Sequence, residues 1–334
     1  MKNKSVASLL FGAFVLIGSV LSAKEKVIFD TDIGGDVDDL IALTYLLAQP
    51  DCDLLGVTVV ASSPSVNLKC EIASAACKAV GRDDVPIHPG LRFPMLNGKW
   101  FCPLGKEGSI PHYWPIVKGR AHETFGRENT AIEFMRRTIR ANPGEVSLVA
   151  TGHFTNLGML FAGDPEIPGL LKRLVLMGGN MKGHLEWNAG CDAVATAIAF
   201  LNGHQSRPPE TIVLSSDVTA PHHLSVEEGR RYLSAKGFEL CAEGAEHWYR
   251  TCKGLYFHDP MAAVAIFKPE IATYMNVTVS VDVAKGGITA IDAKQNPDFG
   301  LLKVATSINA RAFDDELTNV VIRAQRCPRN VTRF

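Results

Sequence analysis

The sequence predicts an α/β fold with a mostly parallel central sheet, helices on both faces, and a small antiparallel extension at the C-terminal end. Three observations support this prediction. Short apolar runs without polar alternation recur along the chain, as in strands that are buried on both faces. Each early run is followed by a segment with the apolar spacing of a helix. After residue 277, strand-like runs follow one another directly, which indicates an antiparallel meander.

The individual elements follow from these apolar runs and from the residues that end them. Strands are expected over residues 27–29, 54–61, 85–87, 146–150, 173–177 and 211–215, and then over 277–283, 287–292 and 301–309. Helices are expected over 38–49, 66–80, 130–141, from 156, over 192–202 and 261–267, and from about 313. Gly81 ends the second helix, because glycine readily adopts the backbone conformation found just beyond a helix.

The first 23 residues differ in kind from the rest. Lys2 and Lys4 precede an apolar stretch over 6–21, and small residues follow it before the next charged segment. A basic start, a short apolar run and small residues are typical of a secretory signal peptide. The run is shorter than the roughly 20 residues of a membrane-spanning helix. We expect a signal peptide over residues 1–23, a periplasmic or secreted protein without stable membrane insertion, and a single domain over 24–334.

Composition excludes some classes of function. Lys and Arg number 34 and Asp and Glu number 35, so no basic field favours nucleic acid as a partner. The eight cysteines are widely and irregularly spaced, without zinc-ligand spacing, so we expect structural or disulfide-paired cysteines and no catalytic thiol.

The long irregular stretch over 89–128 has the character of a lid or binding loop. Within it, His112, Tyr113 and Trp114 would either contact a ligand or pack on the surface.

The strongest functional signal is an acidic segment between the first strand and the first helix. Asp30, Asp32, Asp36, Asp38 and Asp39 fall within ten positions, at the end of a parallel strand where ligands bind in such folds. Their mutual repulsion is costly unless a cation offsets it, and helix capping explains only one or two of them. Oxygen ligands favour Ca²⁺ or Mg²⁺, and flexible coordination by several carboxylates favours Ca²⁺.

Three further groups of polar residues lie at the ends of expected strands or helices. Residues 258–260 read His-Asp-Pro, where Asp and Pro also suit a helix start and His258 is a candidate general acid. Residues 176–180 and 186–188 supply a Gly-Gly-Asn and a Glu-Trp-Asn, which could hold sugar hydroxyls or form a polar loop. Residues 151–157 could be an ordinary strand-to-helix turn capped by a Thr or Asn.

Together these segments resemble the inosine–uridine-preferring nucleoside hydrolase family. That family opens with Asp-x-Asp-x-Gly and a pair of Asp residues, which here are Asp30, Asp32, Gly34, Asp38 and Asp39. Its later motifs are Thr-Gly-x-x-Thr-Asn, then Met-Gly-Gly with Glu-aromatic-Asn, and then His-Asp-Pro. They occur in this order at residues 151–156, 177–188 and 258–260. The resemblance covers nearly the whole mature chain and implies a nucleoside hydrolase-like, Rossmann-like fold.

The resemblance implies a calcium site and a general base. Asp32, Asp39 and Asp259 would ligate Ca²⁺, together with the backbone carbonyl of Thr151. Asp38 would act as the general base on a calcium-bound water. This assignment leaves Asp36 without a defined role.

The resemblance also implies a sugar site and a leaving-group donor. Asn180, Glu186 and Asn188 would hold the ribose. The family has an asparagine after the second strand that touches ribose, and Ser63 would take its place here. His258 would lie near the departing base and protonate it.

The predicted function is calcium-dependent hydrolysis of the N-glycosidic bond of ribonucleosides, which gives free base and ribose, by a homo-oligomer with a small nucleoside as its partner. The alternatives are an exported calcium-dependent sugar- or nucleoside-binding protein of the same fold, and a hydrolase of a different ribosyl-like substrate. Asp38 favours an enzyme, because binding alone needs no base. A haloacid-dehalogenase-type phosphatase fits poorly, because that family has Thr or Val where Gly34 stands.

Overall fold

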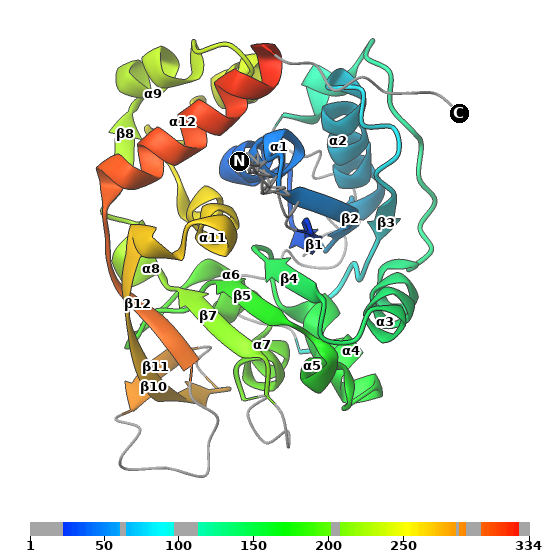
Figure 1. Cartoon of the computed structure of the whole chain (residues 1–334), viewed down its shortest axis with the longest axis vertical. Coiled ribbons are helices and arrows are strands. Elements are labelled where there is room, and N and C mark those ends of the chain that lie inside the picture. The colour runs from blue at the N-terminus through cyan, green and yellow to red at the C-terminus, as the bar shows by residue number, and fades with distance from the viewer. Residues whose placement is uncertain are drawn as a thin grey trace, which may run out of the picture.

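The computed structural model describes residues 23–60, 65–96, 113–201, 208–284, 287–291 and 302–326. Its centre is a ten-stranded sheet with the order β3-β2-β1-β4-β5-β7-β12-β10-β11-β6. Neighbouring strands from β3 to β12 run parallel, and β10, β11 and β6 are antiparallel to their neighbours (Figure 1). The strands are β1 (Glu25–Thr31), β2 (Cys52–Val59), β3 (Ile87–Pro89), β4 (Val146–Ala150), β5 (Arg173–Met177), β6 (Lys182–Leu185), β7 (Glu210–Leu214), β10 (Ala272–Asp282), β11 (Gly287–Ile291) and β12 (Leu302–Ile308). The predicted mostly parallel α/β fold with an antiparallel end is confirmed.

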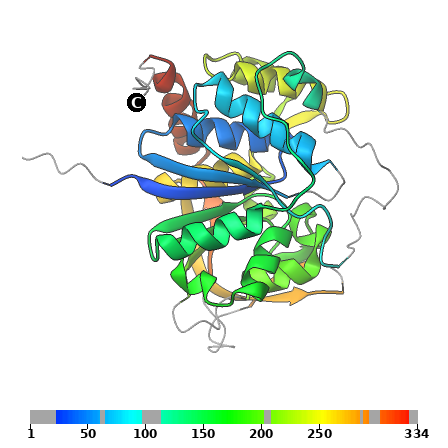
Figure 2. The same ribbon diagram turned by 90° about the vertical axis from the view of Figure 1, so that its right-hand side faces the viewer.

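Helices cover both faces of the sheet (Figures 1 and 2). One layer holds α1 (Asp38–Ala48), α2 (Val66–Ala79), α11 (His258–Phe267) and α12 (Ala310–Arg326), and the other holds α3 (Ala131–Ala141), α4 (Thr155–Gly163), α5 (Ile167–Leu170) and α7 (Ala193–Phe200). Each layer encloses its own apolar core. In β1, Val27 and Phe29 pack in one core and Ile28 in the other, which explains why the strand is apolar without alternation.

Several short elements escaped the sequence analysis. The edge strand β6 reads Lys-Gly-His-Leu and carries no apolar pattern, so it forms through its pairing with β11. Helix α9 did carry a signal, because Ser225 and Glu228 form a capping box at its start. The elements without a counterpart in the prediction are β6, η1 (Trp114–Val117), α5, α6 (Trp187–Cys191), α8 (Ser216–Thr219), β8 (His223–Ser225), α9 (Val226–Leu233), α10 (Glu239–Trp248), β9 (Gly254–Tyr256) and η3 (Pro269–Ile271).

Asp38, Asp39 and Asp259 were candidates for helix caps, but they do not cap their helices. The N-caps of α1 and α11 are Val37 and Phe257, and neither end has a side-chain cap hydrogen bond among the described residues. Asp38, Asp39 and Asp259 instead lie in the first turns of these helices. The capping explanation for these residues is therefore wrong, and their carboxylates are available for another role.

The topology places the acidic segment at a switch point of the sheet. Strand β1 lies between β2 and β4, and the helices that follow β1 and β4 pack on opposite faces. In such sheets the connections diverge and leave a crevice beyond the carboxyl ends of the strands. Gly152 lets the two connections approach, because a Cβ there would lie 2.8 Å from the backbone nitrogen of Asp32.

The described cysteines at positions 70, 77, 191, 241 and 252 are free thiols. Cys102 and Cys327 lie outside the described residues, as do the predicted signal peptide up to residue 22 and Ser63. Cys70 and Cys77 are buried on α2, as expected for small apolar side chains. None of the helices in the described ranges has the length and apolar character needed to cross a membrane.

Candidate active site

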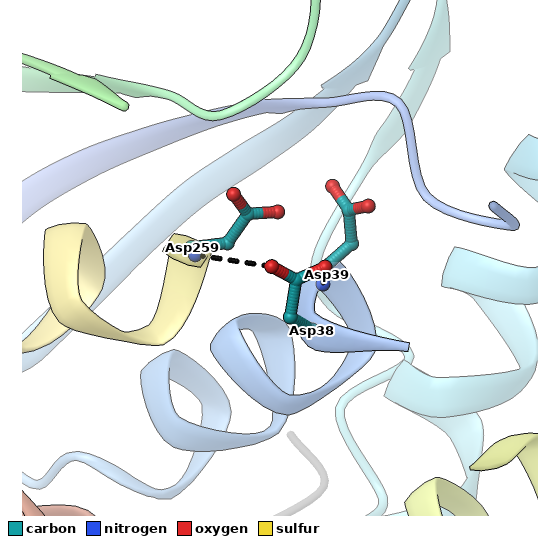
Figure 3. A group of neighbouring side chains, drawn as sticks. All are labelled: Asp38, Asp39 and Asp259. Atoms are coloured by element: carbon teal, nitrogen blue, oxygen red, sulfur yellow. Dashed lines mark hydrogen bonds between the residues drawn. The ribbon is translucent and has the colours of Figure 1, made fainter. Parts of the chain in front are cut away.

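Three buried carboxylates meet at the starts of two helices. Asp38 and Asp39 lie in the first turn of α1 and Asp259 in the first turn of α11 (Figure 3). One carboxylate oxygen from each lies within 4.8 Å of the others. The backbone N–H of Asp259 donates to Asp38 Oδ2 at 3.3 Å, which ties the two helix starts together. The positive ends of two helix dipoles therefore face one acidic cluster.

The electrostatics of this cluster favour a bound cation. Burial, and then the charges of neighbouring aspartates, raise the pKa of Asp38, Asp39 and Asp259 well above the usual value. A divalent cation would reverse this effect, because it stabilises the ionised carboxylates. The donor atoms are all oxygen, and the geometry fits a hard cation such as Ca²⁺ or Mg²⁺.

Two other predicted metal ligands lie beside this cluster. Asp32 lines the same cavity, and its Oδ2 lies 3.7 Å from His153 Nδ1. The Thr151 hydroxyl lies 3.5 Å from Asp39 Oδ1. The backbone carbonyl of Thr151 accepts a hydrogen bond of 2.8 Å from the amide of Asn188, which leaves its second lone pair for another partner.

Unlike the aspartates of the cluster, Asp30 has its carboxylate hydrogen-bonded to neighbouring elements of the fold. Its Oδ1 accepts hydrogen bonds from Thr58 on β2 at 2.6 Å and from Asn156 on α4 at 2.8 Å. Burial raises the pKa of this carboxyl to about 7. Asp30 thus joins β1 to elements on both sides of it and fixes the strand end from which the acidic loop departs.

Tyr113 holds the acidic loop from the other side. Its hydroxyl accepts a hydrogen bond from Gly34 N at 2.8 Å and donates to Asp36 O at 3.2 Å. Gly34 has a φ of 115°, a conformation that favours glycine. The Tyr113 side chain is fully buried, so the expectation of surface packing is wrong for this residue. Trp114 donates its indole N–H to Glu71, and His112 lies outside the described residues.

Replacing Tyr113 with Phe is expected to loosen this loop. The buried N–H of Gly34 loses its partner, which should lower the free energy of unfolding by about 1–3 kcal/mol. It should also weaken cation binding. Chemical denaturation and calcium titration calorimetry measure the two effects. Tyr45→Phe is the matched control, because the Tyr45 hydroxyl is also hydrogen-bonded on a helix of this layer but contacts Gln49 and Glu316. Equal calcium affinity in both variants would contradict the role of Tyr113.

The acidic cluster forms one side of a cavity of ≈ 640 Å³. Met177, Leu185, Trp187 and Trp248 contribute apolar and aromatic surface to its lining. A site that joins a few polar groups to an apolar surface suits a ligand with one polar and one flat apolar part. The predicted site residues that line this cavity are Asp32, Asp38, Asp39, Thr151, Glu186, Asn188, His258 and Asp259.

The predicted sugar-binding residues occupy different places. Glu186 lines the cavity and caps α6, because its carboxylate accepts from Asn188 N and from Ala189 N, each at 3.0 Å. Its Oε2 also accepts from Gly179 N at 2.7 Å. Asn188 also lines it, with its amide nitrogen directed at backbone carbonyls. Asn180 is not among the described lining residues, and its amide donates to Ser216 Oγ at 3.1 Å. The ribose contacts of these residues stay predictions.

His258 lines the cavity at the start of α11. Its Nδ1 lies 2.7 Å from Thr219 Oγ1, and its ring stacks on Tyr256 with centroids 5.4 Å apart. Burial lowers the pKa of the imidazole to about 4. The ring is therefore neutral near pH 7 and offers a hydrogen-bond donor or acceptor rather than a full positive charge.

Sequence reasoning missed three polar or aromatic residues that line the cavity: Lys69, Ser216 and Trp248. Lys69 had a signal, since it lies on α2 among the small and apolar residues of the buried side. Trp248 ends α10, an element that was not predicted, so nothing in the sequence placed it near the acidic segment. Ser216 begins α8, which was also missed.

Comparisons with known proteins agree with this geometry. The sequence profile of the inosine-uridine preferring nucleoside hydrolase family matches residues 27–315. The chain is 27% identical to uridine nucleosidase 1 of Arabidopsis thaliana over 289 residues, which covers 79% of this chain and 80% of that protein. It is 27% identical to the pyrimidine-specific ribonucleoside hydrolase RihA of Citrobacter koseri, over 80% of this chain and 88% of that protein.

Solved structures show the same fold. A purine-preferring ribonucleoside hydrolase from Gardnerella vaginalis superimposes with a TM-score of 0.73 at 22% identity, over 89% of this chain and 98% of that one. An inosine-uridine preferring nucleoside hydrolase from Bacillus anthracis gives a TM-score of 0.70 at 20% identity, over 90% and 99% of the two chains. The profile match spans most of the chain and includes the acidic cluster and the cavity. The protein therefore belongs to the inosine-uridine preferring nucleoside hydrolase family and is a hydrolase that acts on N-glycosyl compounds.

Proposed function

We propose that the protein hydrolyses the N-glycosidic bond of ribonucleosides in a calcium-dependent reaction that gives free base and ribose. The observation that carries this proposal is the buried cluster of Asp38, Asp39 and Asp259 on one side of a cavity that also has an aromatic lining. The carboxylates suit a cation and the polar sugar, and Trp187 and Trp248 offer flat apolar surface for a base. Relatives named for uridine or pyrimidine ribonucleosides support a nucleoside as the substrate.

The proposed ligands of the cation are Asp32, Asp39, Asp259 and the carbonyl of Thr151. When bound, Ca²⁺ would lower the pKa of the attacking water and orient the sugar. Asp38 is the proposed general base that takes the proton from this water. Both of its oxygens accept a backbone N–H, Oδ2 from Asp259 at 3.3 Å and Oδ1 from Asp39 at 3.1 Å, which fixes the orientation of the carboxylate. Each oxygen keeps a second lone pair that can take the proton.

The remaining groups act on the sugar and the base. Cleavage builds positive charge on the ribose ring, and the surrounding carboxylates stabilise that charge. Glu186, which directly follows β6, and Asn188 in α6 line the cavity and are the proposed contacts of the sugar. His258 is the proposed proton donor to the departing base, and it donates as a neutral imidazole near pH 7 because burial lowers its pKa to about 4. The proton that Asp38 takes from the water replaces the one that leaves with the base.

Purified protein incubated with uridine, cytidine, inosine and adenosine is expected to release free ribose from at least one of them. Addition of EDTA should abolish the release, and excess Ca²⁺ should restore it more effectively than Mg²⁺. Ribose is measured by a reducing-sugar assay and the base by chromatography. Absence of ribose release from every nucleoside in the presence of Ca²⁺ would disprove the proposed function. Calcium-dependent binding of a nucleoside without release would instead support the alternative of a binding protein.

A further inference from the structure

Lys69 occupies an unusual position in the cavity. It lies on α2, is only 8% exposed, and lines the cavity beside Asp32. Among the described lining residues it is the one lysine or arginine, and every charged neighbour there is acidic. Its ammonium group donates to the backbone carbonyl of Asp32. Burial of an ammonium group is costly unless hydrogen-bond acceptors or negative charges surround it, so we ask which acceptors its N–H bonds reach at the cavity wall.

The hydrogen bonds of the lining residues show which donors are still available to a ligand. Ionised carboxylates can only accept, and they are the largest group of polar side chains in the lining. The amide nitrogen of Asn188 already donates to Thr151 O at 2.8 Å and to Met177 O at 3.2 Å. The indole N–H of Trp248 donates to Gly254 O at 3.2 Å. Lys69 has three N–H bonds and uses one on Asp32 within the described structure, which leaves two for a ligand.

A sugar hydroxyl needs both kinds of partner. It donates its proton to a carboxylate, and its oxygen then requires a donor or a cation. An anionic ligand is disfavoured here, because the carboxylates that surround Lys69 would repel it. A neutral polyol is not repelled, and it satisfies the carboxylates and the ammonium at the same time.

We propose that Lys69 is a substrate-binding residue that donates a hydrogen bond to a hydroxyl of the sugar held beside Asp32, and so contributes to the selection of the sugar. The inference rests on the proposed nucleoside hydrolysis. Among the described residues that line the cavity, Lys69 is the cationic hydrogen-bond donor. The rival explanation is that Lys69 only holds the acidic loop through the Asp32 carbonyl.

Sugar dependence separates the two explanations. For the best ribonucleoside, Lys69→Met should lower kcat/KM by roughly 10- to 100-fold, the effect of losing a hydrogen bond from a charged group. For the 2′-deoxy or the 3′-deoxy analogue, whichever lacks the contacted hydroxyl, the same substitution should cost less than about threefold on the same principle. Where an analogue turns over too slowly, its competitive inhibition constant replaces kcat/KM. An equal loss on all three sugars, or no loss, would overturn the inference.

The matched control is Lys78→Met on the same helix. Lys78 lies in the last turn of α2 with its Nζ 3.5 Å from Glu123 Oε1, and it is not a described lining residue of the cavity. The substitution Lys78→Met should leave kcat/KM unchanged for every sugar. Lys69→Arg tests the donor without removing the charge and should restore part of the preference for ribose. If Lys69→Met does not fold, the loss of sugar preference in Lys69→Gln decides the question by the same criterion.

A binding measurement separates failure of this inference from failure of the proposed function. Titration calorimetry with Ca²⁺ and D-ribose reads the sugar contact without any turnover. Weaker ribose binding by Lys69→Met, with calcium affinity retained, supports the inference even if no nucleoside is hydrolysed. Turnover by the wild type with equal losses on all sugars overturns only the inference. If the wild type shows no turnover and also no binding of ribose, both the inference and the proposed function are overturned.

Discussion

Replacement of Asp38 with Asn is expected to reduce kcat by about 10³-fold or more while the cation still binds. A general base contributes roughly 10²- to 10⁴-fold, and a carboxamide cannot take the proton. The exchange preserves shape, and the Asn oxygen can still accept the N–H of Asp259 that Asp38 Oδ2 accepts in the structure. The helix starts should therefore stay together. Single-turnover kinetics and calcium titration of the same preparation measure the two effects.

Asp36→Asn provides the control for this substitution. Asp36 lines the same cavity and the exchange removes the same charge, but Asp36 is not one of the three carboxylates that meet in the buried cluster. We expect a loss in kcat of less than about tenfold, well below the range for a general base. Full activity in Asp38→Asn would show that another group is the base. Loss of calcium binding in that variant would make Asp38 a ligand, like the two carboxylates with which it is grouped.

The second large effect is on stability, which should depend on Ca²⁺ and on pH together. In the metal-free protein, burial raises the pKa of Asp30 and Asp36 to about 7 and that of Asp38, Asp39 and Asp259 well above the usual value. Between the unfolded value of about 4 and these raised values, the folded state binds more protons than the unfolded state. The contribution of these carboxyl groups to the free energy of unfolding should therefore be largest at or below about pH 4, and it should fall as the pH rises through about 7.

Ca²⁺ should offset this fall, because it stabilises the ionised carboxylates. At a concentration one hundred times its dissociation constant, it should add about 2.7 kcal/mol. The corresponding rise in Tm is a few degrees and should be larger at pH 8 than at pH 5. Differential scanning calorimetry with Ca²⁺ or EDTA measures it.

Asp39→Asn should remove most of this calcium effect, because Asp39 belongs to the buried cluster. Asp51→Asn is the control, because Asp51 is exposed in the turn before β2 and should keep the full effect. A calcium-dependent rise in Tm that survives in Asp39→Asn, or that shrinks as the pH rises, would contradict the proposed ligand set.

The sequence predicted the sheet and the acidic segment because both are local signals. Strand β5 and strand β4 were predicted to the residue, since a buried parallel strand is apolar on both faces and is bounded by polar residues. Strands β8 and β9 were missed because each has only three residues and the two form by pairing with each other, so their sequences carry little periodicity. Helix α9 was missed although its capping box is a local signal.

The features of the candidate site also fall into those that the sequence predicts and those that only the folded structure decides. The sequence by itself determined that carboxylates gather after β1 and that a nucleoside hydrolase-like order of motifs follows, because these depend on neighbours in the chain. Only the tertiary structure brought Asp259 to Asp38 through the packing of α11 against α1, turned Asn180 towards Ser216, and directed Lys69 into the cavity. Only burial could raise the carboxyl pKa values and lower that of His258. Such effects depend on distances and solvent exclusion between remote segments, and these quantities exist only once the chain has folded.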